Sequence, residues 1–373
     1  MRLPGHCGTI CAMLRRFAVF HRVSGPDLQA WLGDRPGFSL WQSGVVAVAV
    51  WGGWHHSADG KGQGTLCGAL CADHSLSERL QIRGTPRDLC DHRALMIEWL
   101  SAFGPTGLQS LTWQGTLCVI HLAQNRVLVA RDPLGVGDVQ VQALGGGWVI
   151  TSDPMLSQPI DTKTDSPLLL SLPAGTILGL TPAGIAVQAL RLSPEASAYF
   201  REIPDDIRAM TRRQAAQALT LVVQKASQSL SRGTSGLQMP QPINALQQWL
   251  HGQFPRHDRG GGWVSPIGLP TLVGELSDIT TQSDMPNTVS TLPWPVPALE
   301  PPEPLHNLDP DELAQRQRRA TTLIYQLLPA ARVEAAKLGL TLVLPYLAPQ
   351  VLALRGAWTP DQRPTSTDLV AQA

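Results

Sequence analysis

The cysteines are the residues whose type and spacing most directly suggest chemistry. All six lie in the first third of the chain, and two pairs share the pattern Cys-Gly-x-x-Cys, Cys7/Cys11 and Cys67/Cys71. A thiolate is a nucleophile and a metal ligand, although this spacing is one residue longer than the usual Cys-x-x-Cys of zinc and redox sites. Cysteine also packs as a small apolar residue. A buried structural role, a nucleophile and a metal or redox site all stay open.

The second informative stretch is a buried strand that runs into a tight turn. Residues 127–129 are apolar and two of the three are β-branched, which favours a strand. Asp132-Pro133 begins a turn, and Gly135 permits a backbone conformation that a side chain resists. A glycine-rich turn at 145–147 then predicts a hairpin that ends at Ser152-Asp153.

These residues resemble a known family in order and spacing. The run Ala130-Arg131-Asp132-Pro133-Leu134-Gly135, followed by the hairpin and Ser152-Asp153, resembles the end of the glutaminase domain of asparagine synthetases. The segment 172–178 is similar to the Pro-Pro-Gly segment that closes that domain. The segment 339–351 is similar to one near the end of the synthetase domain. The chain is identified as a degenerate and shortened member of this family.

The resemblance implies a site for glutamine hydrolysis. Cys7-Gly8 resembles the Cys-Gly start of class II glutamine amidotransferases, in which the cysteine's own α-amino group acts as the base. Six residues precede Cys7, so this role requires their removal; otherwise Cys7 is an ordinary strand residue. Gly68 would contribute to the oxyanion hole, with Cys67 standing where the family has an asparagine. Asp91 would hold the substrate amine, or it simply favours the positive end of a helix.

The implied architecture is α+β followed by α/β. Residues 1–195 are expected to form an N-terminal-nucleophile (Ntn) type αββα sandwich. Residues 196–373 are expected to form a reduced ATP-pyrophosphatase-like α/β domain with a Pro/Gly-rich insertion around 233–310. The segment 230–238 keeps one Ser-Gly pair of the family's phosphate-binding loop. ATP with magnesium is therefore expected only if this second domain is active.

Local patterns predict the elements that position these residues. A strand is expected over 45–51, an antiparallel meander over 108–190, and a hairpin turn at 181–184. Helical spacing predicts helices over 88–103, 205–232 and 330–338. A further helix is expected from Asp309, interrupted at Pro329.

Composition limits the partners. The formal net charge is zero, which gives no electrostatic reason to expect nucleic acid. No apolar run approaches the roughly 20 residues of a membrane helix, and no export signal is recognisable, so a cytoplasmic protein is expected.

The sequence predicts a catalytically impaired accessory or scaffold subunit of an amide-forming system, such as one that makes amino-acid or peptide natural products. Its expected partner is a protein of that system. One alternative is an active glutamine-dependent amidotransferase after removal of residues 1–6, with glutamine as substrate. The other is a cysteine-based metal or redox protein.

Overall fold

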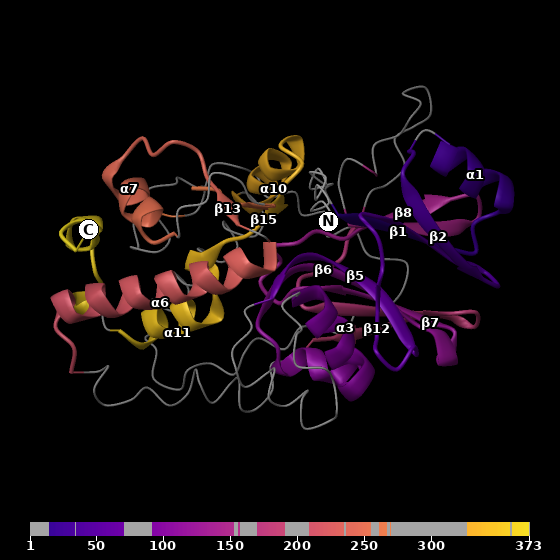
Figure 1. Cartoon of the computed structure of the whole chain (residues 1–373), viewed down its shortest axis with the longest axis horizontal. Coiled ribbons are helices and arrows are strands. Elements are labelled where there is room, and N and C mark those ends of the chain that lie inside the picture. The colour runs from indigo at the N-terminus through magenta and orange to yellow at the C-terminus, as the bar shows by residue number, and fades with distance from the viewer. Residues whose placement is uncertain are drawn as a thin grey trace, which may run out of the picture.

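The structure is a computed structural model. It describes residues 15–33, 35–70, 92–152, 156, 170–190, 209–234, 236–254, 261–266, 269, 327–358 and 360–372. Within these residues, two antiparallel sheets form an N-terminal half, and helices with a small parallel sheet form a C-terminal half. Figure 1 shows the sheets on the right and the long helix α6 on the left.

The first sheet contains six antiparallel strands, with β1 at its centre between β9 and β3. The order is β10-β8-β9-β1-β3-β2. The strands are β1 (Arg16–His21), β2 (Phe38–Ser43), β3 (Val46–Trp51), β8 (Gln140–Leu144), β9 (Gly147–Thr151) and β10 (Leu170–Ser171).

The second sheet also contains six antiparallel strands, in the order β12-β11-β7-β6-β5-β4. Its two longest strands, β5 and β6, pair along their whole length. The strands are β4 (His55–His56), β5 (Gly62–Leu70), β6 (Trp113–His121), β7 (Arg126–Arg131), β11 (Thr176–Thr181) and β12 (Gly184–Ala189).

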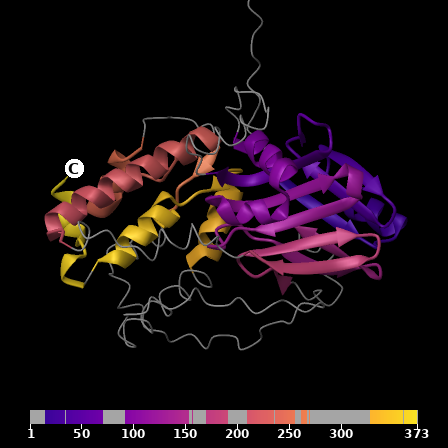
Figure 2. The same cartoon turned by 90° about the horizontal axis from the view of Figure 1, so that it is seen from below.

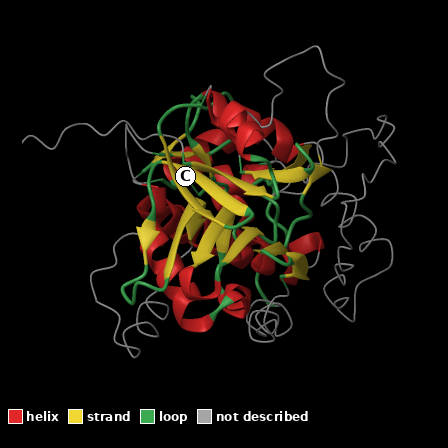
Figure 3. Ribbon diagram, turned by 90° about the vertical axis from the view of Figure 1, so that its right-hand side faces the viewer, coloured by secondary structure: helices red, strands yellow, loops and turns green. Residues whose placement is uncertain are grey.

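The two sheets stack face to face and each carries a helix on its outer face. Helix α1 (Gly25–Gly33) packs on the first sheet, and α3 (His92–Phe103) packs on the second. Short 3₁₀ turns lie at Pro105–Ser110 and Leu122–Gln124. Figure 3 shows the strands enclosed between helices. The predicted αββα layering is therefore confirmed.

Strand β3 shows why this sequence forms a central layer. All six of its residues are buried. Val46, Val48 and Val50 face the other sheet, whereas Ala47, Ala49 and Trp51 face α1. A strand covered on both faces must be apolar at every position, as this run is.

The C-terminal half surrounds three short parallel strands, β13 (Leu237–Gln238), β14 (Gly262–Trp263) and β15 (Thr341–Leu342). Its core includes the buried rings of Trp249, Tyr346 and Trp358. Figure 2 shows α6 and α11 side by side next to the sandwich. The helices are α6 (Arg212–Thr234), α7 (Ala245–Gly252), α10 (Leu328–Lys337), α11 (Pro349–Ala357) and α12 (Ser366–Val370), with 3₁₀ turns at Pro345–Leu347 and Pro360–Gln362.

Helix α6 begins later than the prediction of 205–232. The backbone N–H of Thr211 donates to Gln214 Oε1, and the N–H of Gln214 donates to Thr211 Oγ1. This reciprocal pair is a capping box, which fixes the start of a helix. Met210 therefore lies before the helix, where its carbonyl accepts a hydrogen bond from Gln362. The sequence signal was the Thr-x-x-Gln spacing.

Two other expectations need correction. Residues 108–190 are not one meander, because β8 and β9 belong to the first sheet. The chain crosses between the sheets at the turn after β7, which Asp132 organises. The helix expected over 330–338 is α10, which already includes Pro329 in its first turn, where a proline is tolerated. The helix expected from Asp309 lies outside the described residues.

Candidate functional site

A pair of buried amide contacts joins the two halves. Gln114, in β6 of the sandwich, donates from Nε2 to the Leu344 carbonyl at 2.9 Å. The Leu344 N–H donates back to Gln114 Oε1 at 2.8 Å. One side chain thus satisfies both main-chain groups of a residue just after β15. Gln114 is fully buried, so neither bond competes with bulk water.

Asp132 organises the turn that faces this joint. Its carboxylate accepts backbone N–H groups at 2.8–3.1 Å, two at each oxygen. Asp132 is completely buried. Burial raises the pKa of Asp132, and the N–H donors with the neighbouring Arg131 guanidinium act in the opposite direction. The donors are Gly115, Leu134, Val136 and Gly137.

Two guanidinium groups meet on Asp138 at the end of the same turn. Arg131 Nη1 lies 3.5 Å from Oδ1, and Arg332 Nη1, from α10, lies 3.7 Å from Oδ2. Arg332 also donates to the carbonyls of Gly135 and Val136. The C-terminal half therefore contacts the turn through the ion pair with Asp138 and through hydrogen bonds to the main chain of the turn.

Burial and the neighbouring charges shift the pKa values of Asp138 and Arg332 in opposite directions. Burial alone would raise the pKa of Asp138, but Arg332 and Arg131 hold it below its usual range. Burial lowers the pKa of Arg332 to about 10, against the opposing effect of Asp138. Asp138 and Arg332 are therefore both charged at neutral pH, as a buried ion pair requires.

Three glycines allow the backbones to meet at this point. A Cβ on Gly68 would lie 2.0 Å from the Gln114 carbonyl oxygen. A Cβ on Gly115 would lie 2.3 Å from the Cys67 carbonyl oxygen, and one on Gly137 would lie 2.3 Å from the Gly115 carbonyl carbon. The close approach of β5, β6 and the turn is possible only without side chains.

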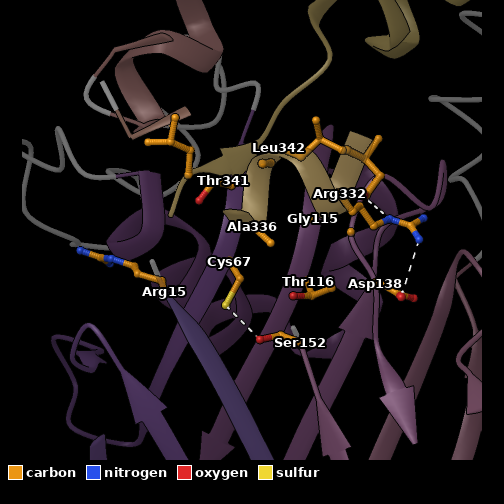
Figure 4. Close-up of a pocket in the computed structure, with 14 residues that line it drawn as sticks. Arg15, Cys67, Gly115, Thr116, Asp138, Ser152, Arg332, Ala336, Thr341 and Leu342 are labelled. Carbon is orange, nitrogen blue, oxygen red and sulfur yellow. Dashed lines mark hydrogen bonds and ion pairs between the residues drawn. The ribbon is translucent and has the colours of Figure 1, made fainter. Parts of the chain in front are cut away.

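A pocket of about 70 Å³ lies between the halves. The sandwich supplies Arg15, Cys67, Thr116 and Ser152 to its wall, and the C-terminal half supplies residues of α10 and β15. Figure 4 shows Cys67, Thr116 and Ser152 gathered below Ala336, with Arg332 reaching Asp138 at one side.

Strand pairing places the polar wall of this pocket. Thr116 pairs with Cys67 on one side and with Arg131 on the other. Residues directly opposite in a ladder share one face of the sheet, so all three face the first sheet. Cys67 Sγ donates to Ser152 Oγ at 3.7 Å, and Ser152 Oγ accepts the Phe17 N–H at 2.8 Å.

The predicted site residues meet this pocket only in part. Cys7 and Asp91 lie outside the described residues, so their roles stay predictions. Gly68 is described: it lies in β5 opposite Gly115, next to the pocket residue Cys67. Its contribution to an oxyanion hole stays a prediction, whereas its close packing explains the glycine.

Sequence reasoning missed Gln114 and Arg332, which join the halves. Neither stands in a recognisable motif, and their partners are 230 and 194 positions away. Asp138 was missed too, although it follows the recognised turn by only a few residues. Ser152 was noted as part of the resemblance, but its contact with Cys67 joins strands far apart in sequence.

The described lining of the pocket contains no evident base for the Cys67 thiol. It includes no histidine and no glutamate, and its acid, Asp138, is paired with two arginines. A general base must be within hydrogen-bond reach of the proton it takes, and the thiol of Cys67 donates to the hydroxyl of Ser152. These described residues can bind and orient a ligand, but they do not form a nucleophile–base pair.

The loop between β13 and α7 is the place in the C-terminal half where the resemblance implies ATP. A phosphate cradle needs free backbone N–H groups between a strand and a helix N-terminus. The loop from β13 to α7 contains Pro240 and Pro242, which lack N–H groups, and the Asn244 side chain already caps α7. The Ser-Gly pair precedes β13 instead of following it. These described residues do not fit the phosphates of ATP.

Among the described residues, no three His, Cys, Asp or Glu side chains stand close enough to hold a metal ion. Four of the six cysteines lie outside those residues, so the metal or redox alternative stays untested. Within the described part, no helix has the length and apolar character needed to cross a bilayer.

Comparison by sequence identifies no relative. No protein-family model matches the chain, and no curated protein matches it.

Comparison by structure gives weak likenesses. One is a glutamine phosphoribosylpyrophosphate amidotransferase from B. subtilis complexed with ADP and GMP, with 13% identity and a TM-score of 0.37; the match covers 56% of this chain and 58% of that one. The second is a glutamine aminotransferase class-II domain protein from Silicibacter pomeroyi, with 12% identity and a TM-score of 0.34, covering 48% of this chain and 99% of that one.

The third is described as the allosteric regulatory enzyme of purine biosynthesis, with 13% identity and a TM-score of 0.32, covering 68% and 69%. None of the three is named as an asparagine synthetase. TM-scores this low establish neither the family nor the activity of this chain.

Proposed function

We propose that this chain is a catalytically impaired, asparagine-synthetase-like protein that acts as an accessory or scaffold subunit of an amide-forming biosynthetic system. The observation that carries the proposal is the composition of the pocket wall. Cys67 stands where the resemblance places an oxyanion-hole asparagine. Cys67 lines the pocket beside Ser152, whose hydroxyl accepts a hydrogen bond from its thiol.

The expected loss of activity has a physical cause. An oxyanion hole stabilises the transition state through N–H donors fixed around the developing charge. Removal of one donor typically costs about 10²–10³ in rate. A thiol is a weak hydrogen-bond donor, so Cys67 is a poor replacement for an amide. In the second half, the segment 230–238 keeps only one Ser-Gly pair of the family's phosphate-binding loop.

A scaffold role is supported by the joint between the halves. Gln114 and Arg332 fasten the C-terminal half to the sandwich through buried contacts. Such contacts maintain a single relative position of the two halves. A protein partner can bind a rigid surface that both halves form together, even where neither half is catalytic.

The test is ammonia release from glutamine by the purified full chain. We expect no turnover above that of Cys7→Ala. The matched control is Cys11→Ala, which removes the other cysteine of the same pair. Turnover that is present in the native chain, survives Cys11→Ala and disappears in Cys7→Ala would refute the impaired-enzyme proposal.

One observation favours the active alternative. Arg15, the first described residue, lines the pocket and follows Cys7 by eight positions. Removal of residues 1–6 would give Cys7 an α-amino group as its base.

This alternative has its own measurement. Intact mass of the protein from its native host shows whether Cys7 is the first residue. A recombinant chain that begins at Cys7 should then hydrolyse glutamine if the alternative holds. Absence of ammonia from this shortened chain would remove it.

A further inference from the structure

The hydroxyl of Thr116 is a buried polar group without a protein partner in the described structure. Thr116 is only 1% exposed, and no described group makes a hydrogen bond with its Oγ1. Thr116 lines the pocket beside its ladder partner Cys67. A buried hydroxyl without a hydrogen-bond partner is unfavourable. A polar occupant of the pocket would supply the missing partner.

The pocket has room for a short chain of atoms. One water-sized group needs roughly 10–15 Å³ of cavity volume. A pocket of about 70 Å³ therefore accommodates around five such groups. The occupant must also place a polar end near the Thr116 and Ser152 hydroxyls. Figure 4 shows that the Cys67 thiol faces the same hollow.

The two described cysteines differ in access. Cys67 lines the pocket and is half-buried, and a thiol must be accessible to react. Cys118 lies in the same sheet but is completely buried, and burial raises the pKa of the Cys118 thiol well above its usual value.

We propose that Cys67 is a thiolation site at which the pocket accepts one arm of a short aliphatic disulfide with a polar end. The Cys67 thiolate attacks one sulfur of that disulfide. A new S–S bond joins Cys67 to the arm, the original S–S bond breaks, and the released thiolate takes up a proton. Cys67 is oxidised and the departing sulfur is reduced, so no other oxidant is needed.

The adduct would occupy the space between the two halves. Its polar end would reach the hydroxyls of Thr116 and Ser152, and its carbon atoms would lie against Ala336 and Leu342. The modification would therefore fill the pocket and exclude any other ligand. This inference does not depend on the proposed function, because it requires neither glutamine hydrolysis nor a partner.

The test treats the reduced full chain with 2-hydroxyethyl disulfide or with oxidised glutathione at equal concentration. Peptide mapping with fragmentation follows each cysteine separately, since Cys67 and Cys71 share a tryptic peptide. With the small reagent, Cys67 should be modified about tenfold faster than Cys118. With oxidised glutathione, whose arm exceeds the pocket, the rate at Cys67 should fall by about tenfold.

Two variants separate a built site from simple exposure. Thr116→Val keeps the shape and removes the hydroxyl, so the rate at Cys67 with the small reagent should fall by about threefold. Thr116→Ser keeps the hydroxyl and should retain the native rate. Equal rates at Cys67 and Cys118, equal rates with both reagents, or an unchanged rate in Thr116→Val would each overturn the proposal.

Discussion

Replacement of Gln114 by alanine should strongly destabilise the contact between the halves. The change removes the acceptor of the Leu344 N–H, in a region where Leu344 is fully buried, whereas the Leu344 carbonyl still accepts the Leu347 N–H. An unsatisfied buried group costs about 1–3 kcal/mol. The lost partner of the N–H should therefore lower the free energy of unfolding by about 1–3 kcal/mol.

The measurement is urea denaturation of the full chain followed by tryptophan fluorescence. Buried tryptophans report on both halves, with Trp113 in the sandwich and Trp249 and Trp358 in the C-terminal half. If the joint couples the halves, Gln114→Ala should also separate their transitions. Limited proteolysis gives an independent reading, because a released half is cut more readily.

The matched control is Gln42→Ala, on the exposed side of the edge strand β2. Surface substitutions of this kind change stability by about 0.5 kcal/mol or less. Gln114→Glu is the sharper variant, since an ionised carboxylate cannot donate to the Leu344 carbonyl. The reasoning fails if Gln114→Ala matches Gln42→Ala within about 0.5 kcal/mol.

Three other predictions concern stability. Arg332→Met should cost about 1.5–3 kcal/mol in urea denaturation because it removes the charged contact with Asp138, which stays paired with Arg131; a loss no larger than that of exposed Lys337→Met would contradict it. Gly68→Ala should cost about 3 kcal/mol by overpacking against the Gln114 carbonyl, whereas Gly25→Ala, with open space around it, should change little; equal effects would count against the strand-contact explanation. Burial lowers the pKa of His21 below 6.5, so the unfolded state binds its proton more tightly and stability should fall as pH drops below about 6.5. His21→Phe should flatten this dependence, while exposed His56→Gln should retain it; an unchanged pH profile in His21→Phe would remove the assignment.

Short-range features of the fold could be predicted from the sequence. The turn at Asp132-Pro133 and the hairpin after Gly145 depend on residues within a few positions, and both are present. The start of α6 was missed because the capping pair of Thr211 and Gln214 lay inside a longer apolar pattern. The passage of the chain between the sheets was missed because strand alternation does not specify which sheet a strand joins.

The candidate site was less predictable for a related reason. Cys67 was recognised only as a departure from an asparagine, since sequence does not show that Thr116 and Ser152 stand beside it. The contacts of Gln114 with Leu344 join positions 230 residues apart. No local rule relates such positions, so only the folded chain reveals the joint and the pocket beneath it.

Most hydrogen bonds of the joint end on main-chain atoms. Gln114 contacts the N–H and the carbonyl of Leu344, and Arg332 donates to the carbonyls of Gly135 and Val136. Any other residue type at position 344 or 136 would still offer a carbonyl, so the acceptor is kept. Gly135 is the exception, because its φ of +67° is strained for a residue with a side chain. The joint therefore tolerates drift in the sequence at its acceptors and constrains it at Gly135 and at the side chains of Gln114, Arg332 and Asp138.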